Sequence, residues 1–400
     1  MLDRKRGTVR ALRRENRAAV LWSLYFSRPG TRQDLSAATG LSPASVTNVV
    51  RELLDEGIVI EAGSVDSDGG RPRVMLEVNP DHGYVVGVDI GETRVRVEIF
   101  DLTMRERAKA EYSLNPGEHD VDAVVEGVLS GLHTVLTESG IEPAAILGMG
   151  VGIAGIIEHR PEAIVHSQTY GWEAVPFERL LRAGTDLPLY IENGAKTMGQ
   201  AELWFGAGRG TPNAVVALIG SGVGASLISS GTTYRSATST AAEWGHTTIM
   251  VDGRKCRCGS AGCLEAYVGA ESILERFGRP TAGSDEESAL AALVDAADTA
   301  PLAAAILDET AEYLGAGIAS LINLFSPERV ILGGWAGLLL GRRLLPAISE
   351  SARKNSLRHL FAATSLELGQ LGPEAVALGA ASLPVEAFLN GSGSARLRRA

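Results

Sequence analysis

The chain has 400 residues, of which 45% are hydrophobic, 21% charged and 5% aromatic. This length exceeds what one compact core holds, so we expect two or three domains. The longest apolar run, residues 144–157, is short and broken by glycines, and the basic start has no apolar stretch behind it, which excludes a membrane-spanning or secreted protein and predicts a cytoplasmic one.

The net charge of −11 is unevenly distributed along the chain. Residues 1–78 hold 12 Lys and Arg against 10 Asp and Glu, a balance of +2, which leaves 25 against 38, or −13, for the rest. Within residues 1–32 the count is 9 against 2. A basic front on an acidic body predicts that one end meets a polyanion. The alternative is an arm that is only solvated.

Three helices are predicted near the start of the chain. Residues 16–26 carry apolar side chains at helical spacing. A short helix over 32–39 follows Thr31 as its cap, and a third over 43–56 follows Ser42. The small core of this unit is expected to contain Leu35, Ala38, Leu41, Val46, Val49, Val50, Leu53 and Leu54.

Two strands follow, over residues 58–64 and 73–79, joined by a polar loop over 65–72. Three helices and a two-stranded wing are the order of a winged helix-turn-helix, so residues 1–78 are predicted to bind double-stranded DNA. The third helix would enter the major groove, and two loop arginines would suit a narrow minor groove. The expected DNA contacts are Arg32, Ser42, Ala44, Ser45, Thr47, Asn48, Arg51, Arg71 and Arg73.

From residue 79 onward the pattern alternates between strands and helices, which indicates an α/β fold. An apolar strand over 85–88 leads into a turn over 89–94 and a second strand, and a strand–turn–strand unit recurs at 214–231. Two such units with glycine-rich turns predict a duplicated lobe that encloses a cleft. The expected domains are a first lobe over 79–197 completed by a C-terminal helix over 373–389, a second lobe over 198–372, and a disordered tail over 390–400.

All three cysteines of the chain, Cys256, Cys258 and Cys263, lie within eight residues. Thiolates this close in a reducing compartment, with glycines to bend the chain, match a tetrahedral zinc site better than a disulfide. His246 is near enough in sequence to be the fourth ligand. No motif for a general base accompanies them, which favours one structural Zn²⁺ per chain. The alternative is three incidental small residues beside a core histidine.

These motifs together resemble the ROK family of repressors, open reading frames and sugar kinases. The run Glu243-x-x-His246 followed by CxCGxxGCxE, with Asp89-x-Gly91-x-Thr93 upstream and LGG at 332–334 downstream, carries the resemblance, which covers residues 14 to about 381. It implies a two-lobed, actin-like ATPase fold with a sugar cleft between the lobes. By position, the implied sugar-binding residues are Gly155, Asn193, Glu243, His246 and Glu265, with His246 serving both zinc and sugar.

The chain departs from the kinases of this family at the catalytic turn. The kinases carry Asn-Asp, whose Asp takes the proton of the attacking hydroxyl, whereas this chain has Asn193-Gly194. Glu192 is expected to point to the opposite face of its strand. On the nucleotide side, Glu92 replaces a small residue and would repel phosphate, and Arg94 replaces a lysine. Ala154 stands before Gly155 where the family often has proline.

The leading hypothesis is therefore a sugar-responsive transcriptional regulator of the repressor branch, not an enzyme. It would bind a sugar or sugar phosphate in the cleft without phosphorylating it, and act as a homodimer or homotetramer on operator DNA. One alternative is an ATP-dependent sugar kinase with an appended DNA-binding head. Another is relief of repression by a protein partner on a lobe surface, which leaves no pattern in the sequence.

Overall fold

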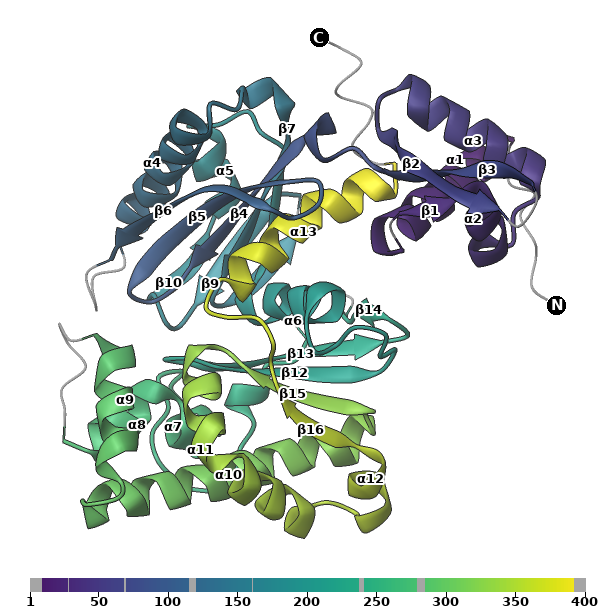
Figure 1. The fold of residues 1–400 in the computed structure, drawn as a ribbon. Helices are drawn as coiled ribbons and strands as arrows, with labels where there is room; N and C mark the ends of the chain where they lie inside the picture. The colour runs from purple at the N-terminus through teal and green to yellow at the C-terminus, as the bar shows by residue number, and fades with distance from the viewer. Residues whose placement is uncertain are drawn as a thin grey trace.

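The computed structural model describes residues 9–27, 29–67, 70–114, 120–159, 161–236, 241–278 and 285–391, without the side chains of Val9, Ser67 and Arg71. The chain forms a head followed by two lobes (Figure 1). Each of the two lobes contains a five-stranded sheet. The basic residues 1–8 and the tail from residue 392 lie outside the described residues. The tail was predicted to begin at Asn390, but this residue is placed and its side chain accepts a hydrogen bond from Trp22.

The head is built as the capping pattern predicts. Its elements are α1 (Val9–Phe26), β1 (Gly30–Thr31), α2 (Arg32–Thr39), α3 (Pro43–Asp55), β2 (Val59–Ser67) and β3 (Gly70–Val78). Thr31 caps α2 in a reciprocal arrangement with Asp34, and the hydroxyl of Ser42 accepts from the amide of Ser45 at the start of α3. The predicted loop over 65–72 is wrong, because antiparallel pairing continues to Ser67 opposite Gly70. Backbone pairing in an isolated ribbon does not require apolar side chains.

Most of the predicted head core is confirmed. Five of its residues are buried and Leu41 and Leu54 are partly buried, whereas Ala38 is exposed on α2, so that prediction was wrong. Helix α1 begins seven residues earlier than predicted and is held to α3 by two ion pairs, Arg13–Glu52 and Arg17–Glu56, both at 2.6 Å. These pairs neutralise two arginines of the basic front. The five buried residues are Leu35, Val46, Val49, Val50 and Leu53.

The first lobe contains a sheet with strand order β11-β7-β4-β5-β6. One face is covered by α4 (Val121–Ser139) and the other by the C-terminal helix α13 (Ala375–Leu389). Helix α13 approaches so closely that a Cβ on Gly150 would lie 1.8 Å from the carbonyl oxygen of Ala380. The strands are β4 (Tyr84–Ile90), β5 (Arg94–Asp101), β6 (Glu106–Ser113), β7 (Ile146–Ile153) and β11 (Leu189–Asn193), beside a small sheet of β8 (Ile156–His159), β9 (Ala163–Ser167) and β10 (Trp172–Val175), with α5 (Phe177–Arg182) and the short helices η1 (Pro80–His82) and η2 (Pro143–Ala145).

The second lobe repeats the strand pairing of the first. Strand β12 pairs antiparallel with β13 and parallel with β15, just as β4 pairs antiparallel with β5 and parallel with β7. This repeat is the duplication that the two strand–turn–strand units predict. The elements are β12 (Ala214–Ile219), β13 (Val223–Ser229), β14 (Thr232–Thr233), η3 (Trp244–His246), α7 (Glu265–Val268), α8 (Ala270–Arg276), α9 (Glu286–Ala296), α10 (Pro301–Phe325), β15 (Arg329–Gly333), α11 (Trp335–Asn355), α12 (Arg358–Ala363) and β16 (Ser365–Leu368).

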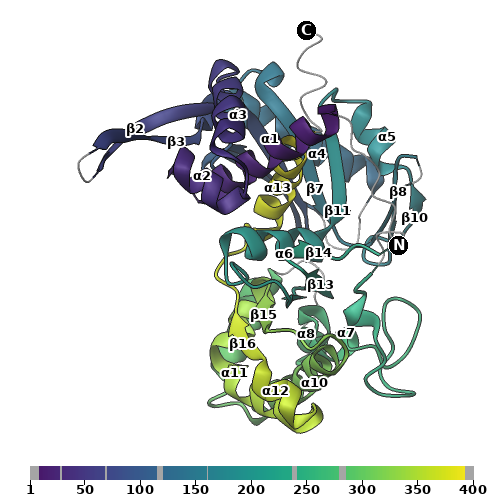
Figure 2. The ribbon, with the colours of Figure 1, turned by 90° about the vertical axis from the view of Figure 1, so that its right-hand side faces the viewer.

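Helix α6 (Gly194–Phe205) lies between the lobes and is buried from Ala195 to Trp204. It packs against α13 of the first lobe and against β12 and β13 of the second. The predicted boundary between the lobes, after residue 197, falls inside this helix. Figure 2 shows α6 and α13 stacked between the head and the second lobe.

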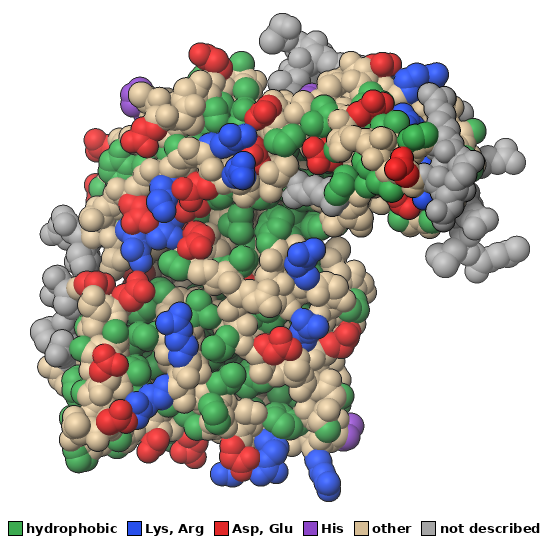
Figure 3. Space-filling model, in the orientation of Figure 1, with side chains coloured by type: hydrophobic (Ala, Val, Ile, Leu, Met, Phe, Trp, Pro, Cys, Tyr) green, Lys and Arg blue, Asp and Glu red, His purple; other side chains and the backbone are tan. Residues whose placement is uncertain are grey.

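Figure 3 shows one face of the molecular surface. Acidic and basic side chains are intermixed on this face, and the head overhangs a hollow beside the second lobe.

Among the described residues, no single helix is both long and apolar enough to cross a membrane. One pair, α9 with α10, passes on length and composition together but is bent by 107°.

Candidate functional site

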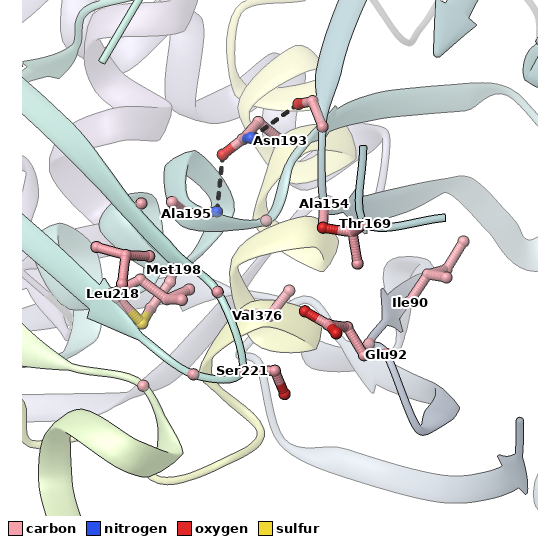
Figure 4. Close-up of a pocket in the computed structure, with 18 of the residues that line it drawn as sticks. Ile90, Glu92, Ala154, Thr169, Asn193, Ala195, Met198, Leu218, Ser221 and Val376 are labelled. Atoms are coloured by element: carbon pink, nitrogen blue, oxygen red, sulfur yellow. Dashed lines mark hydrogen bonds between the residues drawn. The ribbon is translucent and has the colours of Figure 1, made fainter. Parts of the chain in front are cut away.

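A cavity of about 210 Å³ lies between the two lobes. Its walls come from the β4–β5 turn and the start of α6 on one side, and from the β12–β13 turn and residues 256–265, which we call the cysteine segment, on the other. Figure 4 shows Glu92, Asn193, Ala195 and Ser221 around the cavity. The structure brings together in this cavity all five residues that the resemblance implies for sugar, which we call the sugar side. These are Gly155, Asn193, Glu243, His246 and Glu265.

Asn193 organises the first-lobe half of the sugar side. Its Oδ1 accepts hydrogen bonds from the amides of Ala195, at 2.9 Å, and Lys196, at 3.3 Å, and so caps α6. Its Nδ2 donates to the carbonyl of Gly155 at 2.9 Å, which leaves one amide hydrogen for a ligand (Figure 4). Gly155 has a φ of 131°, and a Cβ there would lie 2.4 Å from a backbone oxygen of His166, so only glycine fits.

The residues on either side of Asn193 leave this turn without a carboxylate toward the cavity. Gly194 has an ordinary φ, and a Cβ added to it would meet nothing nearer than 3.8 Å, so the position has room for a side chain. Glu192 is buried on the opposite face of β11, where it contacts Arg235 at 3.0 Å and Lys196 at 3.7 Å. The expected orientation of Glu192 is therefore what the structure has.

Two carboxylates form the second-lobe half of the sugar side. Glu265 is buried, and its Oε2 accepts a hydrogen bond from the amide of Val223 at 2.9 Å, while Oε1 lies 3.2 Å from Nε of Arg257. Glu243 is half-buried, and this burial raises the pKa of its carboxyl while nearby His246 opposes the shift. Neither carboxylate is a solvated surface charge. Both are suited to accept hydrogen bonds from a polyol.

The predicted metal ligands form one cluster. One ligand atom from each of the four residues lies within 4.8 Å of the others. Cys256 Sγ lies 3.6 Å from Nδ1 of His246, and the sulfurs of Cys258 and Cys263 are 3.7 Å apart. Tetrahedral Zn²⁺ with bonds of about 2.3 Å to sulfur and 2.0 Å to nitrogen separates its ligands by about 3.5–3.8 Å. The four residues therefore fit zinc, and Nδ1 of His246 faces the cluster, which leaves Nε2 for the cavity.

The protonation of the cysteines depends on whether a metal is bound. Burial raises the pKa of the Cys256 thiol to about 12 and raises that of Cys263. A metal that binds here would hold the thiolates and release their protons. The metal would join two parts of the chain: η3, which carries His246, and the segment that carries Arg257 and Glu265. Its contribution to the site would be to position these side chains.

The turns over residues 89–94 and 220–224 form the other part of the cavity, which we call the phosphate side. Glu92 places both carboxylate oxygens 3.1 Å from Nη1 of Arg257, across the cleft. Burial raises the pKa of Glu92 to about 7 against the opposing charge of Arg257, and raises that of Asp89 to about 6. Ser221, in the second turn, donates to the buried carboxylate of Glu286. The phosphate side is thus rich in carboxylates.

The predicted DNA contacts on α3 lie on its solvent face. Ser42, Ala44, Thr47, Asn48 and Arg51 are exposed, and Ser45 and Arg32 are partly exposed. The hydroxyls of Ser42, Ser45 and Thr47 make local hydrogen bonds at the start of the helix, whereas Arg51 reaches only to Asn48, at 3.1 Å. Arg73 is exposed on the wing and donates to Gln33 of α2. The side chain of Arg71 lies outside the described residues.

Known proteins match both the sequence and this fold. The model of the ROK family matches residues 85–387. The chain belongs to the ROK family. The xylose repressor of Caldicellulosiruptor bescii is 28% identical over 395 residues, 96% of this chain and 98% of the repressor. The glucokinase of Halalkalibacterium halodurans is also 28% identical, over 313 residues, 74% of this chain and 93% of the kinase.

A solved structure of a ROK family transcriptional regulator, a homolog of the Escherichia coli MLC protein, has a TM-score of 0.79 at 24% identity, over 97% of this chain and 100% of its own. The expected fold class, a winged helix-turn-helix followed by the two-lobed ROK fold, is confirmed. The extent of the matches separates two kinds of ROK relative. The repressor matches almost the whole chain, whereas the glucokinase matches about three quarters of it.

The ROK chain also contains a junction between head and body that sequence analysis missed. The ring of Trp204, near the end of α6, makes edge contacts with Trp22, Tyr25 and Phe26 of α1, with centroids 5.2–5.9 Å apart. Trp22 also donates to Asn390 at the end of α13, at 3.0 Å. A signal was present, because aromatic residues gather at the end of α1 in a chain that has only five tryptophans.

Two charged residues were missed as well. Arg257 lies between Cys256 and Cys258, and its pairing with Glu92 depends on a contact 165 residues away in sequence. Glu202 of α6 is buried, and its carboxylate accepts from the amides of Ala207 and Leu371, at 2.7 and 3.0 Å. It thereby ties α6 to the segment that leads into α13. Nothing local in the sequence marks either role.

Proposed function

We propose that this ROK protein is a sugar-responsive, DNA-binding transcriptional regulator that represses genes of carbohydrate uptake or catabolism. The observation that carries the proposal is the turn at Asn193-Gly194. It keeps a side chain able to hold a hydroxyl and lacks a general base, in a chain that also carries a winged helix-turn-helix. The protein binds sugar on the sugar side and does not phosphorylate it, and its zinc, one per chain, is structural.

The relatives support this proposal through the parts of the chain that they share. The match to the xylose repressor of Caldicellulosiruptor bescii covers nearly the full chain, head included. That repressor therefore matches both the head and the lobes of this chain. The glucokinase shares the lobes. A chain that joins a DNA-binding head to a kinase-like cleft without its base is suited to sensing sugar.

Two helices connect the sugar side to the head. Helix α6 is capped by Asn193, lines the cavity through Ala195 and Met198, and carries Trp204 near its end, against α1. Helix α13 starts beside the cavity at Ala375. Asn390, directly after the end of this helix, accepts a hydrogen bond from Trp22 of α1. A sugar that binds one arrangement of the lobes better than another would shift both helices and, with them, the head.

The head requires a partner copy to read a full operator. One recognition helix covers one half-site, and two-fold dimers meet two half-sites one helical turn apart. We therefore propose that the protein acts as a homodimer or homotetramer on a roughly palindromic operator. A sugar-driven change in head position would alter the spacing of the two α3 helices, which weakens binding to DNA.

The proposal is tested by fluorescence anisotropy with operator DNA from the gene's own promoter region, titrated with a panel of pentoses and hexoses. We expect one sugar to weaken operator binding at least tenfold, and no ADP release when that sugar is supplied with ATP and magnesium. Affinity for DNA should fall as salt rises, because phosphate contacts release counterions. Turnover that is lost on changing Asn193 or Glu243 would overturn the proposal in favour of a kinase.

A variant pair tests the DNA-binding surface separately. Replacing exposed Arg51 by alanine should lower operator affinity by about 1–3 kcal/mol, whereas Arg353→Ala, an exposed arginine on α11, should leave it unchanged. Equal affinity of Arg51→Ala and the parent protein for the operator would remove α3 from the interface.

Release of operator DNA only by a protein fraction, with every sugar inactive, would favour a protein inducer over a sugar.

A further inference from the structure

The phosphate side of the cleft is closed by an ion pair that joins the two lobes. Glu92 belongs to the β4–β5 turn of the first lobe, and Arg257 to the cysteine segment of the second lobe. Their side chains are 19% and 20% exposed, and Nη1 of Arg257 lies 3.1 Å from both carboxylate oxygens. A pair this well shielded from water is screened by salt much less than a surface pair. Salt is therefore expected to weaken the pair only a little.

The guanidinium of Arg257 faces carboxylates on every nitrogen. Nη1 contacts Glu92, Nε lies 3.2 Å from Glu265, and Nη2 lies 3.0 Å from Glu271. Guanidinium groups are the natural partners of phosphate because their donors match its oxygens. Here a phosphate could reach this group only by displacing a carboxylate that is already in place.

The remaining charges of the cavity do not compensate. Arg94 also lines it, and its guanidinium lies 3.6 Å from Glu287 and 3.9 Å from Glu111. Among the described residues that line the cavity, four are carboxylates and two are arginines. A phosphate group adds a charge of about −1.5 to −2 and would meet this excess of like charge. The four carboxylates are Asp89, Glu92, Glu243 and Glu265.

An uncharged sugar meets no such obstacle. Each hydroxyl donates one hydrogen bond and accepts others, and the sugar side offers both kinds of partner. Glu243 accepts, and one hydrogen of the Asn193 amide remains to donate. His246 presents the ring nitrogen that does not face the cysteines.

We propose that the Glu92–Arg257 ion pair makes the cleft selective for an unphosphorylated, uncharged sugar and excludes sugar phosphates and nucleotides. This inference rests on the proposed function and names the ligand class of the same site. Glu92 acts by occupying the cation that a phosphate would use and by adding a negative charge beside it. The protein then reports on free sugar, before the reaction that phosphorylates it.

The test is calorimetry on the full-length, zinc-loaded protein with D-xylose, D-glucose and N-acetyl-D-glucosamine, each beside its phosphate ester. For the sugar that binds, we expect the free form to bind at least 100-fold more tightly than its ester. In Glu92→Gln, and in Glu92→Ser as a second variant, the ester should gain at least tenfold relative to the free sugar. Glu350→Gln removes the same charge from an exposed arginine pair on α11 and should leave the ratio unchanged.

Three outcomes would overturn the inference. An ester that binds the parent protein as tightly as the free sugar contradicts it directly, as does a ratio that neither Glu92 variant changes. In both cases the sugar still binds and releases operator DNA, so the proposed function stands. If no sugar or ester binds and none releases DNA, the proposed function fails first and the inference fails with it.

Discussion

The sugar side and the phosphate side of the cleft face one cavity but are built in different ways. On the sugar side, Asn193 is held by backbone hydrogen bonds and His246 lies against the cysteine cluster, and both still direct an atom at the cavity. On the phosphate side, Glu92 and Arg257 satisfy each other, and Ser221 is bound to Glu286. Polar atoms on the sugar side remain available to a ligand, whereas the charged and polar groups on the phosphate side bind other groups of the protein.

The contrast bears on how a kinase-like cleft would serve the proposed sensor. Phosphoryl transfer needs a base, a nucleotide and cations on the transferred group. The chain lacks the base at Gly194 and engages its cation at Arg257, while the groups that would hold a sugar remain. The base position, Gly194, lies next to Asn193, so the two residues of one turn separate sugar recognition from proton transfer.

The largest effect is expected on removal of the metal from the sugar side. Cys258→Ser should reduce zinc from about one per chain to a small fraction, lower the free energy of unfolding by several kcal/mol, and abolish sugar binding, because His246 and Glu265 lose their shared anchor. Metal analysis by mass spectrometry, urea unfolding and calorimetry measure the three results. Ser260→Ala, exposed in the same segment, is the control. Full sugar affinity without metal would show that the cluster is not part of the sugar side.

A smaller effect is expected at Asn193, where recognition and structure can be separated. Asn193→Ala removes the cap of α6 and the bond to Gly155, and should cost about 1 kcal/mol in stability and about 10- to 100-fold in sugar affinity. Asn193→Asp keeps an acceptor for the cap but cannot donate to Gly155. It should keep the part of the stability that comes from the cap, lose the part that comes from the bond to Gly155, and lose the affinity, as judged by urea unfolding and calorimetry. Equal sugar affinity in both variants and the parent would leave Asn193 as a cap only.

The sequence predicts the sugar side far better than the phosphate side. The predicted metal ligands lie within eighteen residues, so a local motif locates them, and the resemblance to the ROK family locates Gly155 by position. Glu92 could be recognised as hostile to phosphate from the sequence, but its pairing with Arg257 is a contact between lobes. The same limit applies to Trp204 and α1, because such contacts follow from how the lobes and head pack, which no local pattern encodes.

The pH dependence of stability should distinguish the two sides as well. Burial raises the pKa of Glu92 to about 7, above its usual 4.5, so the folded protein binds this proton more tightly than the unfolded chain does. Stability is then greatest below pH 4.5 for this group and falls as pH rises to about 7, by at most about 3 kcal/mol. Urea unfolding at pH 5, 6, 7 and 8 measures the fall. Glu92→Gln should reduce the fall but not abolish it, because burial also raises the pKa of Asp89 and of Glu243. An unchanged slope in that variant would mean that Glu92 is solvated.

The smallest effect is expected where a kinase would have its base. Gly194→Asp should fold well, because a Cβ there meets nothing nearer than 3.8 Å and a carboxylate in the first turn of α6 is favoured by the helix dipole. A general base contributes about 10²- to 10⁴-fold to transfer, yet we expect no ADP release from this variant with D-glucose or D-xylose, ATP and magnesium, because Glu92 still closes the phosphate side. Gly194→Asn, equal in size, is the control.

The double variant Gly194→Asp with Glu92→Gly carries that experiment to its conclusion. Measurable turnover in the single variant would show that the phosphate side was never closed, and the contrast between the two sides would fail. Turnover only in the double variant would show that base and closure are the two missing parts. If the double variant is also inactive, nucleotide binding must be blocked elsewhere. The indole of Trp335 is the first place to look, because its Nε1 would lie 3.3 Å from a Cβ on Gly220 in the second turn.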